Sequence, residues 1–309
     1  MNMGWKGVGD DMIYISVAEM AKKWGVSERT VREYCSSGRV AGSFMTGKTW
    51  NIPEDAQKPM RKARSRKIPV EILPRLKFEK NEQVKGGLYH KIQIEMTYNS
   101  NHIEGSRLSH EQTRYIYETN TIGVDDKTIN VDDVVETVNH FRCIDLMIDM
   151  ADKKLTEKLI KQFHMILKTG TSDSRKGWFA VGDYKKLENE VGNLETTHPE
   201  NVKEELQKLL NDYNAKKLKK LDDLLEFHYQ FERIHPFQDG NGRVGRLILF
   251  KECLCNNIVP FIIEDSMKLF YYRGLHNWKD ERGYLRDTCL TEQDKFKEYL
   301  DYYGIEYEN

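Results

Sequence analysis

The most informative part of the chain runs Ile234-His235-Pro236-Phe237-Gln238-Asp239-Gly240-Asn241-Gly242-Arg243-Val244-Gly245-Arg246. It offers, in order, an imidazole, an apolar anchor, a carboxylate, a Gly-Asn-Gly turn and two arginines. The apolar residues from Val244 to Phe250 have the spacing of a helix. We therefore expect a tight glycine turn that leads directly into the start of a helix.

Such a turn exposes its main-chain N–H groups, and the start of a helix adds unpaired N–H groups and the positive end of its dipole. Together they predict an anion cradle at Gly240, Asn241 and Gly242. Arg243 and Arg246 are three residues apart on one helical face, where both can reach one polyphosphate.

The two remaining polar groups suit chemistry on a phosphate. Asp239 is a hard oxygen ligand for Mg²⁺ that rides on a polyphosphate. His235, just before the turn, can take a proton from an incoming hydroxyl. Taken singly, these residues also fit a buried histidine, a loop and a solvated pair of arginines. Their combination at fixed spacing favours a catalytic site.

This stretch resembles the signature of the Fic family, His-x-Phe-x-Asp/Glu-Gly-Asn-Gly-Arg-x-x-Arg, at every specified position. The resemblance implies transfer of AMP from ATP to a Ser, Thr or Tyr hydroxyl of a protein, with release of pyrophosphate. His235 would be the general base, and Asp239 would hold Mg²⁺ between the α- and β-phosphates. The Gly-Asn-Gly backbone, assisted by the Asn241 side chain, would bind α- and β-phosphate oxygens, and the two arginines would neutralise the outer phosphates.

An earlier segment resembles the inhibitory helix of the same family. Apolar residues between 88 and 103 recur with helical spacing, and Ser100-Asn101-His102-Ile103-Glu104-Gly105 matches the pattern Ser/Thr-x-x-x-Glu-Gly/Asn. The resemblance implies a helix at about 88–105 whose Glu104 pairs with Arg246. ATP would then bind with its α-phosphate misaligned, and since positioning supplies most of the rate, the enzyme would be held inactive.

Two further segments are expected beside this site. Ser172–Glu200 is polar and glycine-containing, and Gly177–Phe179 with Val191–Thr197 fit a β-hairpin. The resemblance to Fic proteins implies that this hairpin is a flap that holds a target segment by strand addition. Tyr271 and Tyr272 match a Tyr-Tyr-x-x-Leu pattern that lies beside the adenine base in Fic proteins. Packing at the back of the domain is an equally good explanation for these two tyrosines.

The first part of the chain has a different character. Two short segments, each capped by a serine (Ser16 and Ser27), flank a turn at Gly25, as in a helix-turn-helix. A hairpin is expected next, with strands Arg39–Phe44 and Lys48–Pro53 around a turn at Met45–Gly47.

This N-terminal pattern resembles a winged helix of the excisionase or MerR-like class. The resemblance implies that Arg29, Thr30 and Arg32 enter the major groove of DNA and that Lys48 and Arg39 meet phosphates. Protein–protein contact or dimerisation is the alternative use of such a domain.

Charge and length support two domains. The chain has 309 residues and a net charge of −1, but residues 1–67 carry +6 and the remainder −7. A basic front end favours contact with nucleic acid. We expect a winged helix-turn-helix at 1–57, a basic linker at 58–71 and a mainly α Fic-type domain with a β-hairpin flap at 72–309.

The five cysteines form no Cys-x-x-Cys pair, which favours reduced thiols in a cytoplasmic protein over disulfides or structural zinc. No apolar run approaches the length of about 18 residues that spans a membrane. Homodimerisation is left open.

The predicted function is a protein adenylyltransferase that uses ATP and Mg²⁺, modifies a target protein or itself, and is inhibited in cis by Glu104. One alternative is a DNA-binding transcriptional regulator whose Fic body senses nucleotide or dimerises. Another is a Fic enzyme that removes AMP or transfers another group.

Overall fold

The computed structural model describes residues 13–60, 68–123, 128–191 and 194–308. The chain divides into two compact units at Lys67/Ile68. This division falls within the predicted linker 58–71, of which residues 61–67 lie outside the described part. The two units are considered separately below.

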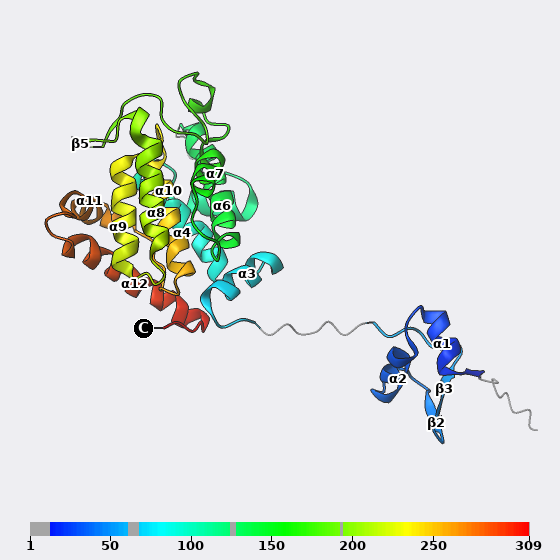
Figure 1. Cartoon of the computed structure of the whole chain (residues 1–309). Helices are drawn as coiled ribbons and strands as arrows, with labels where there is room; N and C mark the ends of the chain where they lie inside the picture. Colours follow the sequence, from blue (N-terminus) through cyan, green and yellow to red (C-terminus); the bar gives the residue numbers. More distant parts are fainter. Residues whose placement is uncertain (1–12, 61–67, 124–127, 192–193, 309) are drawn as a thin grey trace, which may run out of the picture. The chain divides into compact units, whose positions relative to one another are not determined.

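The helices of the N-terminal unit begin where the sequence predicts (Figure 1). Helix α1 (Val17–Trp24) has a capping box: the Ser16 hydroxyl accepts the Glu19 N–H, and the Glu19 carboxylate accepts the Ser16 N–H. Gly25 ends this helix in the left-handed conformation, with φ 64°. Ser27 caps helix α2 (Glu28–Ser36) by accepting the N–H of Thr30 with its hydroxyl.

A small antiparallel sheet completes this unit, in the order β1 (Tyr14–Ile15), β3 (Thr49–Pro53), β2 (Phe44–Thr46). Strand β2 begins at Phe44 and not at Arg39, because Gly42 has a φ of 75° that interrupts an extended chain. The turn consists of Gly47 and Lys48, so the predicted turn at Met45–Gly47 is wrong by two residues at its start. Helices and sheet enclose one apolar core that includes Met20, Val31 and Ile52.

The C-terminal unit is a helical bundle with a small hairpin. Its helices are α3 (Ile72–Glu82), α4 (Leu88–Ile103), α5 (His110–Thr119), α6 (Val131–Asp149), α7 (Glu157–Lys168), α8 (Val202–Ala215), α9 (Leu221–Ile234), α10 (Asn241–Cys255), α11 (Lys268–Asn277) and α12 (Gly283–Tyr303). Helix α4 agrees with the helix expected at about 88–105.

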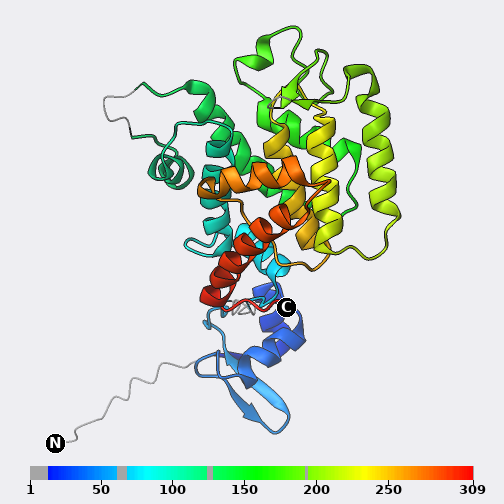
Figure 2. The same ribbon diagram turned by 90° about the vertical axis from the view of Figure 1, so that its left-hand side faces the viewer.

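Helix α10 lies at the centre of this bundle (Figure 1). It packs against α4, α6, α7 and α9, and nearly all of its side chains are buried. Helix α12 contacts α4 and α9 and carries α11 on it (Figure 2). Because α10 is buried on nearly all sides, its neighbours fix the position of its first turn.

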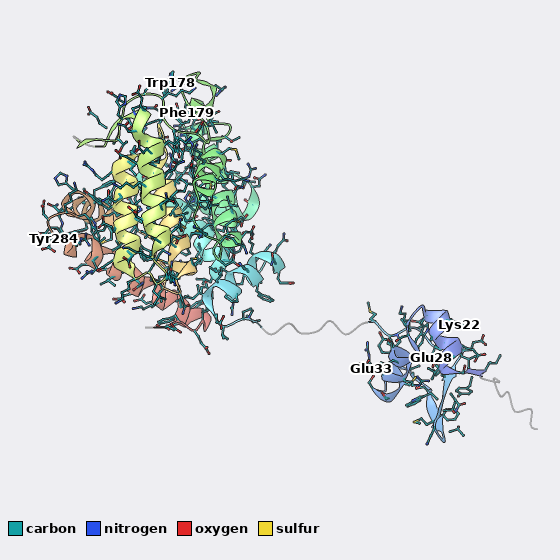
Figure 3. All side chains as sticks on the ribbon, viewed as in Figure 1. Lys22, Glu28, Glu33, Trp178, Phe179 and Tyr284 are labelled. Carbon is teal, nitrogen blue, oxygen red and sulfur yellow. The ribbon has the colours of Figure 1, made fainter. Side chains whose placement is uncertain are left out.

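The predicted hairpin is present but smaller than expected. Strand β4 (Glu190–Val191) pairs antiparallel with β5 (Leu194–Glu195). Gly177–Phe179 is not part of it, which corrects that prediction: Phe179 is buried with its ring 6.0 Å from that of His164, and Trp178 beside it is exposed (Figure 3). Burial of Phe179 in the core decides its conformation more strongly than local strand propensity.

Within the described ranges, none of the helices combines the length and the apolar character needed to cross a bilayer.

Candidate active site

His235 ends helix α9 in an unusual backbone conformation. It has φ 50° and ψ 62°, and its N–H donates to Phe231 O at 2.9 Å. A left-handed conformation is uncommon for a residue with a side chain and turns the chain sharply out of the helix. The Nδ1 atom lies 3.3 Å from Glu232 O, which favours a proton on Nδ1 and leaves Nε2 as the free base.

The surroundings keep this imidazole neutral. Burial lowers the pKa of His235 to about 4. The hydrogen bond with the Glu232 carbonyl raises this pKa, and the positive charge of Lys185 lowers it further. At neutral pH the ring therefore carries no charge and can accept a proton.

The loop after His235 is held by the side chain of Asn241. Its Oδ1 accepts the Phe237 N–H at 2.8 Å, and its Nδ2 donates to Phe237 O at 2.7 Å. Asn241 is 1 % exposed, so both amide atoms are used inside the protein. This corrects the prediction that the Asn241 side chain assists at the phosphates: it fixes the loop instead. Phe237 stacks on His164 with 4.0 Å between ring centroids, as expected for a structural anchor.

Helix α10 begins earlier than the apolar pattern indicates. Gly240 precedes it with φ 82°, and Asn241 and Gly242 form its first turn. The predicted anion cradle is therefore the N-terminus of a central, buried helix, with unpaired N–H groups at its start.

A carboxylate already lies at this helix start. A Cβ added to Gly242 would lie 2.3 Å from Glu104 Oε1 and 3.0 Å from Arg246 Nη1. Glu104 is the residue that follows the last turn of α4, so α4 delivers its carboxylate to the first turn of α10. Gly105 continues the chain with φ 96°.

Arg246 joins α10 to the predicted inhibitory segment. Its Nη2 lies 2.7 Å from Glu104 Oε1 and 2.9 Å from Ser100 O, and its Nε lies 3.0 Å from Ser100 Oγ. The predicted Glu104–Arg246 ion pair is thus present. Burial by itself raises the pKa of Glu104, but the charges of Arg246 and Arg243 outweigh it and lower the pKa below its ordinary value. The glutamate is ionised at neutral pH.

Four charged groups below the cradle form a network that the sequence did not reveal. Lys168 Nζ, almost fully buried, lies 2.6 Å from Asp239 Oδ2 and also pairs with Glu136. Arg243 pairs with the same Glu136 and lies 3.3 Å from Asp239. Lys168 and Glu136 come from α7 and α6, and no motif marks them; only the tertiary fold brings them to the signature.

This network decides how Asp239 can act. Burial by itself raises the pKa of Asp239, but the positive charges of Arg243 and Lys168 outweigh this effect and lower the pKa well below its ordinary value. The Asp239 side chain is 47 % exposed, and Oδ2 carries the contacts with Lys168 and Arg243. One ionised, accessible carboxylate fits Mg²⁺, which usually arrives with phosphates and takes only one or two protein carboxylates. Within the described residues there is no group of three or more His, Cys, Asp or Glu side chains arranged to hold a metal ion.

The two predicted adenine-side tyrosines differ. Tyr271 is 1 % exposed, and its hydroxyl lies 2.6 Å from His228 Nε2, so it is a core residue in this structure. Tyr272 is 37 % exposed, and the charges of Glu104 and Arg246 both act on its hydroxyl. Of the two, only Tyr272 is exposed, and a contact of either tyrosine with adenine stays a prediction.

The predicted DNA contacts are mostly exposed. Arg29, Arg32 and Lys48 face solvent, with Lys48 at the tip of the β2–β3 hairpin. Arg32 forms an ion pair with Glu28 at 2.8 Å, and the Thr30 hydroxyl lies 2.9 Å from that of Ser27. The Thr30 side chain is thus used within the helix cap. DNA binding stays a prediction.

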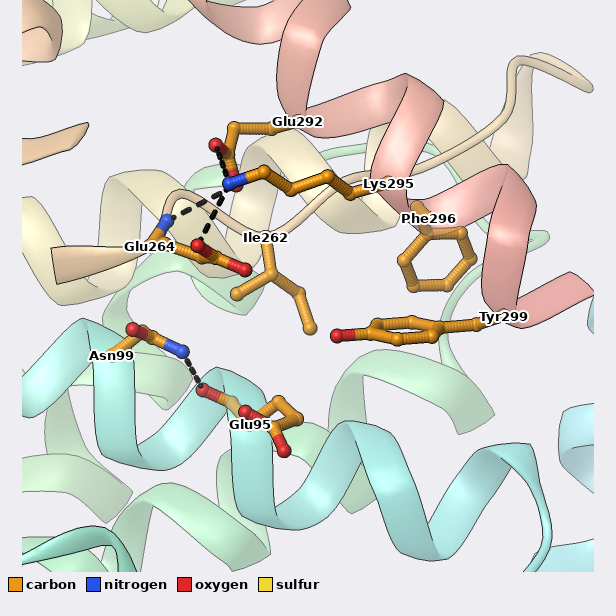
Figure 4. A pocket seen from close by; sticks show the side chains of 8 residues that line it. All are labelled: Glu95, Asn99, Ile262, Glu264, Glu292, Lys295, Phe296 and Tyr299. Carbon is orange, nitrogen blue, oxygen red and sulfur yellow. Dashed lines mark hydrogen bonds and ion pairs between the residues drawn. The ribbon is translucent and has the colours of Figure 1, made fainter. Parts of the chain in front are cut away.

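A small cavity lies on another side of α4 (Figure 4). It has a volume of about 10 Å³, room for a single water, and its lining includes Glu264 and Glu292, which Lys295 bridges at 2.7 and 3.0 Å. Asn99 on α4 accepts the Asp265 N–H here at 2.9 Å. These contacts anchor α4; the space is too small for a substrate.

Known proteins resemble this chain in sequence and in fold. Residues 154–252 match the sequence model of the Fic/DOC family. The protein adenylyltransferase fic-1 of Caenorhabditis elegans is 26% identical over 211 residues, which cover 66% of this chain and 40% of the relative. The protein adenylyltransferase Fic of Drosophila virilis is 27% identical over 203 residues, 61% of this chain and 39% of the relative. The chain thus spans about two fifths of these curated relatives.

Solved structures show the same fold. A Fic domain containing signaling protein from Bacteroides thetaiotaomicron superposes with a TM-score of 0.55 at 22% identity, covering 75% of this chain and 91% of that protein. Fic-1 from C. elegans gives a TM-score of 0.58 at 20% identity, covering 74% and 71%.

Proposed function

We propose that this chain, part of which matches the Fic/DOC family, transfers AMP from ATP to a hydroxyl side chain of a protein, itself included, and that Glu104 restrains the reaction. The observation that carries the proposal is the carboxylate of Glu104 at the first turn of α10. An intramolecular anion already lies in the predicted phosphate cradle, beside a neutral imidazole.

The residues fit an in-line displacement at the α-phosphorus. The oxygen of the target hydroxyl attacks the α-phosphorus. The bond between the α-phosphorus and the oxygen that bridges to the β-phosphate breaks. Pyrophosphate leaves, and the hydroxyl proton passes to Nε2 of His235. This atom is free because Nδ1 faces the Glu232 carbonyl.

The start of α10 would bind the phosphates through main-chain N–H groups, and Arg243 and Arg246 would add positive charge. Arg243 is already held in place by Glu136, so its charge is preorganised. Mg²⁺ bound with ATP would neutralise charge on the phosphate oxygens, and the accessible part of the Asp239 carboxylate is the group that would hold it.

Restraint by Glu104 follows from the same contacts. As long as Arg246 is paired with Glu104 and Ser100, it is not available to the terminal phosphate of a nucleotide. The Glu104 carboxylate both pairs with Arg246 and fills the space beside Gly242. Its release would therefore free the arginine and the space at the same time.

The proposal is tested with the Glu104→Gly chain, Mg²⁺ and ATP labelled either at the α- or at the γ-phosphate. We expect the α-label alone to become attached to protein, and His235→Ala in that background to abolish the labelling. His276→Ala, an exposed histidine on α11, is the control and should label normally. Attachment of the γ-label would instead identify a phosphate transferase.

A further inference from the structure

The segment that precedes the hairpin lies along the loop of the active site. Lys185 N–H donates to Pro236 O at 2.9 Å, and Asn189 Nδ2 donates to Phe237 O at 3.0 Å. The Leu187 N–H donates to Gln238 Oε1 at 3.2 Å. These bonds join residues 185–189 to two main-chain carbonyls and one side chain directly after His235, so the positions of the two segments are coupled.

The ammonium group of Lys185 joins this segment to both ends of the hairpin. Its Nζ lies 2.6 Å from Asn189 Oδ1, just before β4, and 2.6 Å from Thr196 Oγ1, just after β5. The Thr196 hydroxyl donates to Asn189 O at 2.8 Å. One cation therefore fixes the two stems of the hairpin to each other and, through its own backbone, to the catalytic loop.

Burying the ammonium group of Lys185 costs desolvation free energy. The residue is 3 % exposed, and both of its Nζ contacts are neutral oxygens. Burial lowers the pKa of Lys185 to about 8, although Glu188 and Glu205 act in the opposite direction. A buried methionine of similar length would avoid this cost of desolvation, but it could not hold two oxygen acceptors at once.

The hairpin also offers an unpaired edge. Within the described residues, β4 pairs only with β5, which leaves the other side of β4 open to an added strand. The position of a protein segment bound at that edge would depend on the two ends of the hairpin, which Lys185 holds together.

We infer that Lys185 is a positioning residue: through Asn189 and Thr196 it sets the hairpin relative to His235, and so aligns the hydroxyl of a target segment with the base. The inference rests on the proposed AMP transfer. In it, Lys185 affects the alignment of the acceptor hydroxyl and does not affect the affinity for nucleotide.

The test compares Lys185→Met with Lys186→Met, its exposed neighbour, and with Lys185→Arg, all in the full-length Glu104→Gly chain. Two quantities are measured on each variant: the rate of self-labelling with ATP and Mg²⁺, and the affinity for Mg²⁺ with a non-hydrolysable ATP analogue. We expect Lys185→Met to lower the labelling rate roughly 10- to 100-fold with an unchanged affinity. Lys185→Arg should restore much of the rate, since a guanidinium can reach both oxygens.

Hydrogen exchange supplies a readout that does not depend on catalysis. Amides of residues 189–191 and 194–197 should exchange faster in Lys185→Met than in Lys186→Met, while those of α10 stay protected. Equal labelling rates in the two methionine variants, or a parallel loss of labelling and nucleotide affinity, would overturn the inference. Absence of AMP transfer by every variant would refute the proposed function. Unchanged exchange at 189–191 and 194–197 would refute the positioning role of Lys185 independently of catalysis.

Discussion

Glu104 Oε1 lies 2.7 Å from Arg246 Nη2, although 142 positions separate the two residues in the chain. The same oxygen lies so close to Gly242 that no Cβ could be added there without a clash. A single carboxylate thus neutralises an arginine of the predicted phosphate site and fills the start of α10. This contact unites the two functional segments that the sequence suggested separately.

Gly242→Ala tests whether phosphates need the space that Glu104 occupies. In the Glu104→Gly background we expect labelling to fall roughly tenfold or more, because a methyl group would prevent close approach of a phosphate to the backbone. Alanine favours a helix more than glycine, so unfolding would not explain the loss. Gly123→Ala, whose added Cβ meets nothing within 4 Å, is the control. Equal rates for both variants would place the phosphates elsewhere.

The titration of His235 tests the proposed base. Its folded-state pKa of about 4 lies below the ordinary 6.5, so the neutral form is favoured and persists as the pH falls. We expect the His235 signal in an NMR titration, assigned by its absence from His235→Ala, to stay that of a neutral ring down to about pH 5. A midpoint near 6.5 would show that the ring is open to water and that burial does not set its charge.

Lys168→Met tests the buried charge network. Removing the ammonium leaves Glu136 and Asp239 with Arg243 alone, and loss of one partner from a buried ion pair costs about 3–5 kcal/mol of unfolding free energy. Lys176→Met, which removes an exposed partner of Asp173, should cost about 0–1 kcal/mol. Urea denaturation measures both. A similar small loss in the two variants would contradict a structural role for the network.

DNA binding by the N-terminal unit is a separate prediction. If Lys48 and Arg29 contact DNA, the intact chain should bind duplex DNA with an affinity that falls steeply as salt rises, and Lys48→Ala with Arg29→Ala should weaken it. Glu33→Ala, which removes an exposed carboxylate of α2, should not weaken it. Fluorescence anisotropy measures this, and an affinity independent of these residues would favour the alternative of protein–protein contact.

The sequence predicted the elements whose signals are local. The serine caps of α1 and α2 are confirmed, because a cap depends only on a few neighbouring residues. The turn that carries His235 and the glycines was evident for the same reason. The start of α10 was predicted too late, since Gly240–Gly242 read as a loop although the first turn of the helix begins at Asn241.

The parts that escaped prediction depend on tertiary contacts. Lys168 and Glu136 lie on two different helices, and nothing in either sequence context distinguishes them from surface charges. Tyr271 and Tyr272 are neighbours with the same side chain, yet α11 buries one and exposes the other. Phe179 is not part of the hairpin because its ring is buried against His164 in the core.

The most direct test is the intact mass of the chain after incubation with ATP and Mg²⁺, measured for the parent and for Glu104→Gly. The account predicts that the parent stays almost unmodified and that the variant gains the mass of one or more AMP groups on hydroxyl residues. Equal masses for the two proteins, or an AMP adduct on the parent to the same extent, would contradict restraint by Glu104 at this site.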